Sequence, residues 1–155
     1  MRRGLIVLAA LWLGAGAALA CAPDMAELRG PWGQARFSVE VADDAQERAQ
    51  GLMNRDSLGA SRGMLFLYER PIHATFWMRN TLIPLDMIFL DAQGRVTRIH
   101  ENAQPLDETI VDGGRGVAAV LEINGGLARR IGITVGSEMH HPFFGPQAAW
   151  PCTAP

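Results

Sequence analysis

Hydrophobic and polar positions alternate along residues 37–41, FSVEV, so that three apolar side chains fall on one face. This period of two is typical of a half-buried strand. Other runs are almost continuously apolar and do not alternate with polar residues, and such runs predict buried strands. These runs occupy residues 64–68, 74–78, 85–91 and 117–123, and weaker strand patterns follow at 95–103 and 138–141.

Two short helices are predicted between these strands. Asp44 and Glu47 have the spacing of a capping box, and Gly51 marks the expected end of the first helix. The turn Asn124-Gly125-Gly126 leads into a second brief helix at 127–133. Turn-rich segments at 54–63 and 104–116 are expected to be loops.

The order of these elements predicts an α+β fold that is mostly β. Most strands are joined by short turns, which favours antiparallel pairing, and helices are too few for a doubly wound sheet. We expect a compact, largely antiparallel rolled sheet or barrel with two short helices. The domain is expected to span residues 36–142, between an irregular lead-in at 21–35 and an irregular tail at 143–155.

The first twenty residues have the pattern of a signal peptide. Arg2 and Arg3 precede an apolar run that is short for a membrane span, and Ala18-Leu19-Ala20 has the small-x-small form of a cleavage site. Cleavage there would leave Cys21 as the first residue. The expected location is therefore periplasmic or secreted, with no membrane span after cleavage.

The two cysteines, Cys21 and Cys152, leave two alternatives. An exported protein with two cysteines favours a disulfide between them. Alternatively, Cys21 carries a lipid and anchors the chain as a lipoprotein, although Ala-Leu-Ala-Cys is only a partial match to a lipoprotein signal. Neither cysteine lies in a CxxC motif, so a redox-catalytic role is disfavoured.

Composition disfavours nucleic acid as a partner. The formal net charge is −2, all fourteen basic residues are arginine, and no basic run occurs.

Four ordered motifs resemble the DUF192 family, also called UPF0127. They are ERAQGLMNR, GMLFLYE, FWMRNTLIPLDMIFLD and VLEINGG, and the resemblance extends over residues 37–138. It implies a single small β-rich domain, often exported in bacteria, and it implies no reaction. The cysteine-bearing extensions at both ends are not required by the family pattern.

Asp86 is the most unusual polar residue, because it lies between Leu85 and Met87 in an apolar strand. A buried carboxylate needs an arginine or several backbone N–H donors. Candidate partners are Arg48, Arg55 and Arg79, or groups of the turn at 80–84. Asp86 is thus expected to be a structural pin for that turn, with ligand binding and acid–base catalysis as alternatives.

The residues before Asp86 are candidates for a binding rim. Trp77 shares a strand face with Arg79, an arrangement that suits a stacking platform for a sugar or planar ligand, or a ring capped by its own arginine. Asn80 and Thr81 are expected to form the turn and to line the mouth of any pocket.

Glu122 lies inside the apolar strand 117–123 and predicts an ion pair, with Arg55 as the expected partner. A metal site is not predicted, because no HxH or HExxH spacing occurs and the adjacent His140 and His141 would face opposite sides of a strand. No GxSxG motif or phosphate loop is present, and no cofactor is expected.

These observations favour a non-enzymatic exported domain that binds a small molecule, glycan or envelope partner near residues 77–81. One alternative is a hydrolase that uses Asp86 and Glu122 as paired carboxylates. The other is an envelope structural or assembly protein without a pocket, which would expose an apolar patch instead.

Overall fold

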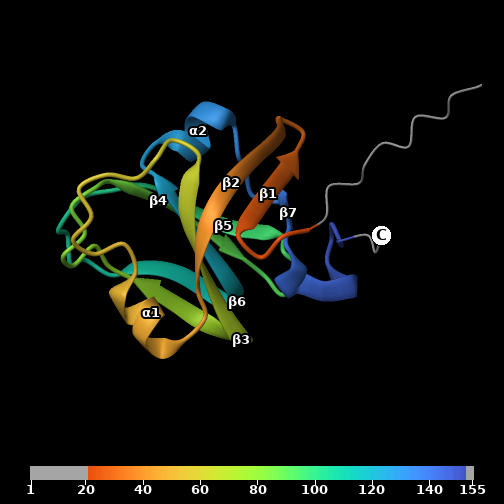
Figure 1. The fold of residues 1–155 in the computed structure, drawn as a ribbon, viewed down its shortest axis with the longest axis horizontal. Coiled ribbons are helices and arrows are strands. Elements are labelled where there is room, and N and C mark those ends of the chain that lie inside the picture. The colour runs from red at the N-terminus through yellow and green to blue at the C-terminus, as the bar shows by residue number, and fades with distance from the viewer. Residues whose placement is uncertain (1–20, 153–155) are drawn as a thin grey trace, which may run out of the picture.

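The computed structural model describes residues 21–152, which form a curled seven-stranded sheet with short helices at its periphery (Figure 1). The predicted mostly β fold is confirmed. The predicted signal peptide lies outside the described residues. Among the described helices, none has the length and apolar character needed to cross a membrane. The elements are β1 (Met25–Gly30), β2 (Gly33–Ala42), α1 (Ala45–Gln50), β3 (Arg62–Phe76), β4 (Leu85–Leu90), β5 (Val96–Ala103), β6 (Val111–Asn124), α2 (Leu127–Ile131), β7 (Glu138–His140) and the 3₁₀ helix η1 (Pro142–Gln147).

The sheet has the order β5-β4-β6-β3-β2-β1-β7 and rolls until its two edges meet. The N–H of Val96 donates to the carbonyl of Ser137 at 2.8 Å, and the N–H of Met139 donates to the carbonyl of Gly94 at 2.8 Å. The strands pair antiparallel except for β2 and β3, which are parallel. Parallel neighbours need a crossover connection, and α1 lies within it.

The central strands β3, β4 and β6 are buried on both faces, which explains their continuous apolar sequences. Leu65, Ile88 and Leu121 point into a core shared with β1 and β2. Their chain neighbours Phe66 and Phe89 point into a second core on the other face. The molecule therefore has two apolar layers, separated by one sheet.

The predicted irregular lead-in at 21–35 is wrong, because β1 and the start of β2 lie within it. Ala26 and Leu28 are buried and alternate with polar residues, and a tight turn pairs Gly30 with Gly33. Alanine, leucine and glycine have weak strand preferences, so the local sequence concealed this hairpin. The tail is not wholly irregular either, since it contains η1 with Phe144 buried.

A disulfide joins Cys21 to Cys152, with 5.6 Å between their Cα atoms. It links the residues before β1 to the residues after η1, and it confirms the predicted pairing. The bond occupies the Cys21 sulfur that a lipid anchor would need. Nearby, the guanidinium of Arg29 lies 4.5 Å from the centre of the Trp150 ring, and the imidazole of His140 stacks on Trp150 with 4.8 Å between ring centres. Both ends of the described chain are therefore fastened to the sheet.

Candidate functional site

A cleft of about 120 Å³ opens between the C-terminal end of α1 and the last residues of β3. It lies on the face of the sheet that carries the second core. Its walls combine aromatic rings with hydroxyl, guanidinium and carboxyl groups. The lining residues are Arg48, Ala49, Gln50, Gly51, Leu52, Met53, Phe66, Tyr68, Thr75, Phe76, Trp77, Thr81 and Glu122.

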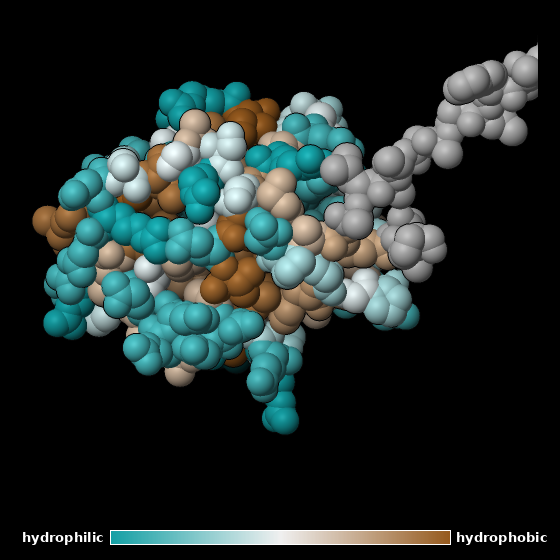
Figure 2. Space-filling view, viewed as in Figure 1, coloured by the Kyte–Doolittle hydropathy of each residue, from teal (hydrophilic) through white to brown (hydrophobic). Residues whose placement is uncertain are grey.

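One wall of the cleft is built by α1 and the turn that follows it. The helix starts with the predicted capping box, in which the N–H of Glu47 donates to Asp44 Oδ1 at 2.8 Å. It ends at Gly51, where the backbone has φ 48 and the chain turns to bury Leu52. The helix buries none of its own side chains, and its outer surface is hydrophilic (Figure 2). The helix therefore serves as a rim for the cleft.

Glu122 of β6 reaches the base of the cleft. Its strand neighbours in the sheet are Met64 and Met87, and the residue is only 4 % exposed. Within residues 21–152, no salt bridge involves Glu122. Burial without a cation raises the pKa of its carboxyl to about 8. Glu122 is therefore mainly an uncharged acid at neutral pH.

Arg48 and Tyr68 also line the cleft. Arg48 Nη1 donates to the carbonyl of Leu67 at 2.9 Å, and its guanidinium lies 5.2 Å from the centre of the Tyr68 ring. Burial raises the pKa of the Tyr68 phenol, and the positive charge of Arg48 acts in the opposite direction. The phenol accordingly keeps its proton and remains a hydrogen-bond donor in the cleft.

The predicted rim is divided between the cleft and the adjacent turn. Trp77 is 43 % exposed and lies at the mouth, with the Arg79 guanidinium 5.5 Å from its ring centre. Thr81 is buried and lines the cleft. Asn80 is exposed with φ 55, and its carbonyl accepts from the N–H of Asn54 at 2.8 Å. Asn80 thus forms the turn, as expected, but does not line the cleft.

Asp86 lies outside the cleft, and its side chain is buried. Its Oδ1 accepts from the backbone N–H groups of Asn102 and Gly126, both at 2.7 Å, and its Oδ2 accepts from the N–H of Ala128 at 2.7 Å. Asp86 is a structural pin, as expected, but it fastens β5 and the start of α2. Within residues 21–152, it forms no hydrogen bond to the 80–84 turn and no salt bridge with an arginine.

The predicted ion pair between Arg55 and Glu122 is also wrong. Arg55 forms a two-pronged pair with Glu40 of β2, with both N–O distances at 2.6 Å. This bond lowers the pKa of Glu40. The pair lies at the surface, where two long polar side chains remain hydrated, whereas Glu122 faces the second core.

The geometry also contradicts a hydrolase with Asp86 and Glu122 as paired carboxylates. In the β4–β6 ladder, Asp86 lies opposite Ile123 and Met87 lies opposite Glu122. Residues one step apart in a strand point to opposite faces. The two carboxyls are therefore separated by the sheet, and no reacting group reaches both.

The cleft residues that sequence reasoning missed are Arg48, Tyr68 and Thr75. Tyr68 offered a signal, because it follows Met64 and Phe66 at a spacing of two and so shares their strand face. The sequence does not show that this face also receives Glu122 from β6. That meeting depends on the β3–β6 register, in which Met64 lies opposite Glu122.

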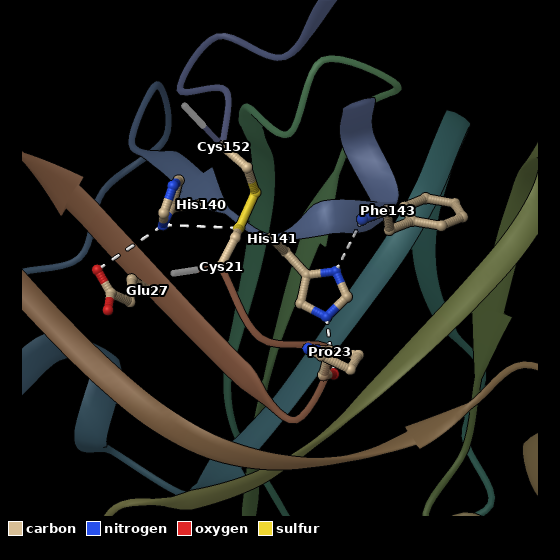
Figure 3. The surroundings of a disulfide bond; sticks show 7 residues. All are labelled: Cys21, Pro23, Glu27, His140, His141, Phe143 and Cys152. Atoms are coloured by element: carbon tan, nitrogen blue, oxygen red, sulfur yellow. Dashed lines mark hydrogen bonds and ion pairs between the residues drawn. A yellow bond between two sulfur atoms is a disulfide. The ribbon is translucent and has the colours of Figure 1, made fainter. Parts of the chain in front are cut away.

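Within residues 21–152, a group of three possible metal ligands, Cys21, His140 and Cys152, lies at the disulfide and outside the cleft. His140 and His141 point to opposite sides, as predicted, and Figure 3 shows His141 turned toward Pro23. Its Nε2 donates to the Pro23 carbonyl at 2.9 Å, and its Nδ1 accepts from the N–H of Phe143. Burial lowers the pKa of His141, which favours this neutral form.

Comparison with known proteins identifies related solved structures. A crystal structure of a protein of unknown function from Novosphingobium aromaticivorans DSM 12444 is 48 % identical, with a TM-score of 0.73 over 74 % of this chain and 82 % of that chain. A candidate transcription regulator from Sinorhizobium meliloti 1021 is 38 % identical, with a TM-score of 0.73 over 78 % of this chain and 95 % of that chain. No curated protein matches. The DUF192 family model, described as "Uncharacterized ACR", matches residues 28–141, and the chain belongs to this family.

Proposed function

We propose that this protein is an exported, non-enzymatic binding module whose cleft takes a neutral, hydroxylated small molecule, such as the terminal unit of a glycan. The observation that carries the proposal is Glu122, a buried carboxyl without a cationic partner among the described residues, placed at the base of a cleft. The Cys21–Cys152 disulfide supports export of the protein, because disulfides persist in oxidising compartments outside the cytoplasm.

The protonation of Glu122 selects the chemistry of the ligand. A protonated carboxyl donates one hydrogen bond and accepts others, so it suits a hydroxyl or carbonyl oxygen without requiring a charge on the ligand. The pKa of about 8 keeps this proton in place at neutral pH. The Tyr68 and Thr81 hydroxyls and the Arg48 guanidinium line the same cleft. They add polar groups that suit the hydroxyls of a polyol.

Trp77 gives the cleft an apolar platform. Its ring is 43 % exposed and is held by Arg79, and a flat indole face packs well against the C–H face of a sugar ring. The volume of about 120 Å³ limits the ligand to one ring or a group of that size, since a cavity of about 150 Å³ holds a molecule the size of benzene. A larger chain would therefore enter by its end.

The binding test is titration of the ¹⁵N-labelled protein with glucose and N-acetylglucosamine, followed by amide chemical shifts. We expect shifts at residues around Trp77 and Glu122, and binding that weakens as pH rises above about 8 because Glu122 then ionises. Tyr68 and Arg48 also face the cleft, so the same titration is repeated with a Tyr68→Phe variant. A pH dependence that survives this change belongs to Glu122.

Two variants of Glu122 separate a neutral ligand from a cationic one. Glu122→Gln keeps a neutral hydrogen-bonding group and is expected to retain sugar binding within about fivefold, whereas Glu122→Met keeps the volume and loses binding. Methylammonium is the cationic probe. Binding of methylammonium that strengthens with pH and vanishes in Glu122→Gln, without sugar binding, would overturn the neutral-ligand proposal.

A further inference from the structure

We propose that reduction of the Cys21–Cys152 disulfide creates a zinc site formed by both thiolates, the imidazole of His140 and the carboxylate of Glu27. Figure 3 shows these four side chains gathered where β1, β7 and the residues around η1 meet. The site is separate from the cleft and does not depend on the proposed function.

The distances among the two sulfurs and His140 fit a zinc site. The donor atoms of Cys21, His140 and Cys152 all lie within 4.8 Å of one another. His140 Nδ1 is 3.9 Å from Cys21 Sγ and 3.9 Å from Glu27 Oε2. With metal–ligand bonds of about 2.0–2.3 Å, donors of a tetrahedral zinc ion lie about 3.3–3.8 Å apart. Small side-chain movements therefore suffice to bring His140 and the separated sulfurs onto one ion. Glu27, whose Oε2 lies beside His140 Nδ1, would turn toward the sulfurs to become the fourth ligand.

The sheet holds two of the ligands in place before an ion arrives. Glu27 of β1 and His140 of β7 are directly opposite each other in the antiparallel ladder. The His140 ring stacks on Trp150 at an interplanar angle of 25°, and its side chain is only 13 % exposed. Stacking fixes the direction of Nδ1, which faces Cys21. Orientation of a histidine ligand by neighbouring groups is a common feature of metal sites.

The surrounding charges leave the site open to a cation. Arg36 pairs with Oε1 of Glu27, which leaves Oε2 turned toward His140. Arg29 is another nearby cation, and it pairs at 2.8 Å with Glu138, which also pairs with Arg95. Two thiolates and one carboxylate would then face the ion. Sulfur and imidazole ligands of this kind favour zinc over magnesium or calcium.

Disulfide and metal are alternative states of the same sulfurs. A dithiol reductant reduces the bond by thiol–disulfide exchange: the reductant becomes a disulfide, and Cys21 and Cys152 each become a thiol. Binding of Zn²⁺ then releases the two thiol protons. Oxidation reverses the process and expels the ion, because the sulfurs of a disulfide are not thiolate ligands. Cys21 and Cys152 would thus be linked either by a covalent bond or through a zinc ion.

The test uses Co²⁺ as a visible substitute for Zn²⁺. The protein is reduced with a phosphine. The phosphine is then removed under anaerobic conditions, and the protein is titrated with Co²⁺. We expect one Co²⁺ per chain, a sulfur-to-cobalt charge-transfer band, displacement by Zn²⁺, and a higher melting temperature with Zn²⁺. The oxidised protein should show none of these. Absence of the band in reduced protein, folded or unfolded, would overturn the proposal.

Variants assign the ligands. Cys21→Ser with Cys152→Ser should abolish the charge-transfer band, while His140→Ala and Glu27→Gln should each weaken Co²⁺ binding by about tenfold or more. His100→Ala changes an exposed histidine away from the cluster and is the matched control. Unchanged affinity in His140→Ala, or a band that persists without the cysteines, would contradict the site.

Discussion

Asp86 and Glu122 lie one residue out of step on the paired strands β4 and β6, and their carboxyl groups point to opposite faces of the sheet. Asp86 receives three backbone hydrogen bonds and fastens the fold. Glu122 forms no salt bridge with any described residue, and it lines a cleft. Two acidic residues in similar apolar sequences therefore have different roles, and each role can be tested by substitution.

Replacing Asp86 with alanine should destabilise the protein by about 2–4 kcal/mol, because buried and partly buried N–H donors lose their acceptor. Asp86→Asn should also be destabilising. Both carboxylate oxygens of Asp86 accept backbone N–H groups, whereas asparagine offers one oxygen acceptor and an NH₂ group that can only donate. Chemical denaturation measures both. A free energy of unfolding equal to that of wild type in Asp86→Ala would show that Asp86 is not a pin.

The pH dependence of stability should carry the signature of Glu122. Folding raises its pKa from 4.5 to about 8, so the folded state binds a proton that the unfolded state releases between these values. The free energy of unfolding therefore falls as pH rises through this window, by about 1.4 kcal/mol per unit of pKa difference. Glu122→Gln should match wild type near pH 4.5 and exceed its stability near pH 8.

The matched control for that measurement is Glu108→Gln, which removes an exposed carboxyl. His141 contributes in the opposite direction: its pKa is lowered from 6.5, so its contribution to stability is present above 6.5 and is lost as pH falls below it. The difference between wild type and Glu122→Gln cancels this contribution. A difference that stays constant from pH 4.5 to 8 would contradict the assignment to Glu122.

Arg55 should be energetically coupled to Glu40 and independent of Glu122. The Arg55–Glu40 pair is more than a third exposed on both side chains, so a double-mutant cycle should give only about 0.2–1 kcal/mol. The same cycle between Arg55 and Glu122 should give a value near zero. The account would be wrong if the second coupling exceeded the first.

Trp77→Ala should lower stability by about 1 kcal/mol or less, because the ring is 43 % exposed at the mouth of the cleft. Met78→Ala, one residue along the chain, removes a buried side chain and should cost about 2–5 kcal/mol. Thermal melting compares the two. A loss in Trp77→Ala as large as that in Met78→Ala would show that the indole belongs to the core and is no platform.

The features of the fold that depend on residues close together in the sequence, such as helix caps, could be predicted. The capping box at Asp44, the helix end at Gly51, the pairing of the only two cysteines and the centres of the buried strands were confirmed. The strand bounds were not, because β3 is one strand through the segments predicted at 64–68 and 74–78, and β6 begins at Val111 inside the predicted loop 104–116. The β1 strand was missed because Ala26 and Leu28 carry little strand preference, and only pairing with β2 makes them a strand.

Partners that are distant in sequence could not be predicted. Asp86 accepts a hydrogen bond from the N–H of Ala128, which is 42 residues away in the sequence. Arg55 forms its salt bridge with Glu40, whereas Glu122 was the expected partner. Each pairing depends on how segments that are distant in the sequence pack together, and the local sequence does not show this. The same limit concealed the cleft, because Tyr68 and Glu122 meet only through the β3–β6 ladder.

The most direct test of the central claim is the pKa of the Glu122 carboxyl. It is measured by ¹³C NMR of side-chain-labelled glutamate across pH 3 to 10, with Glu122→Gln to assign the resonance. A pKa of about 8 would establish Glu122 as an uncharged acid in the cleft at neutral pH. A pKa near the ordinary 4.5 would show a charged, stabilised carboxylate and would contradict the proposed mode of binding.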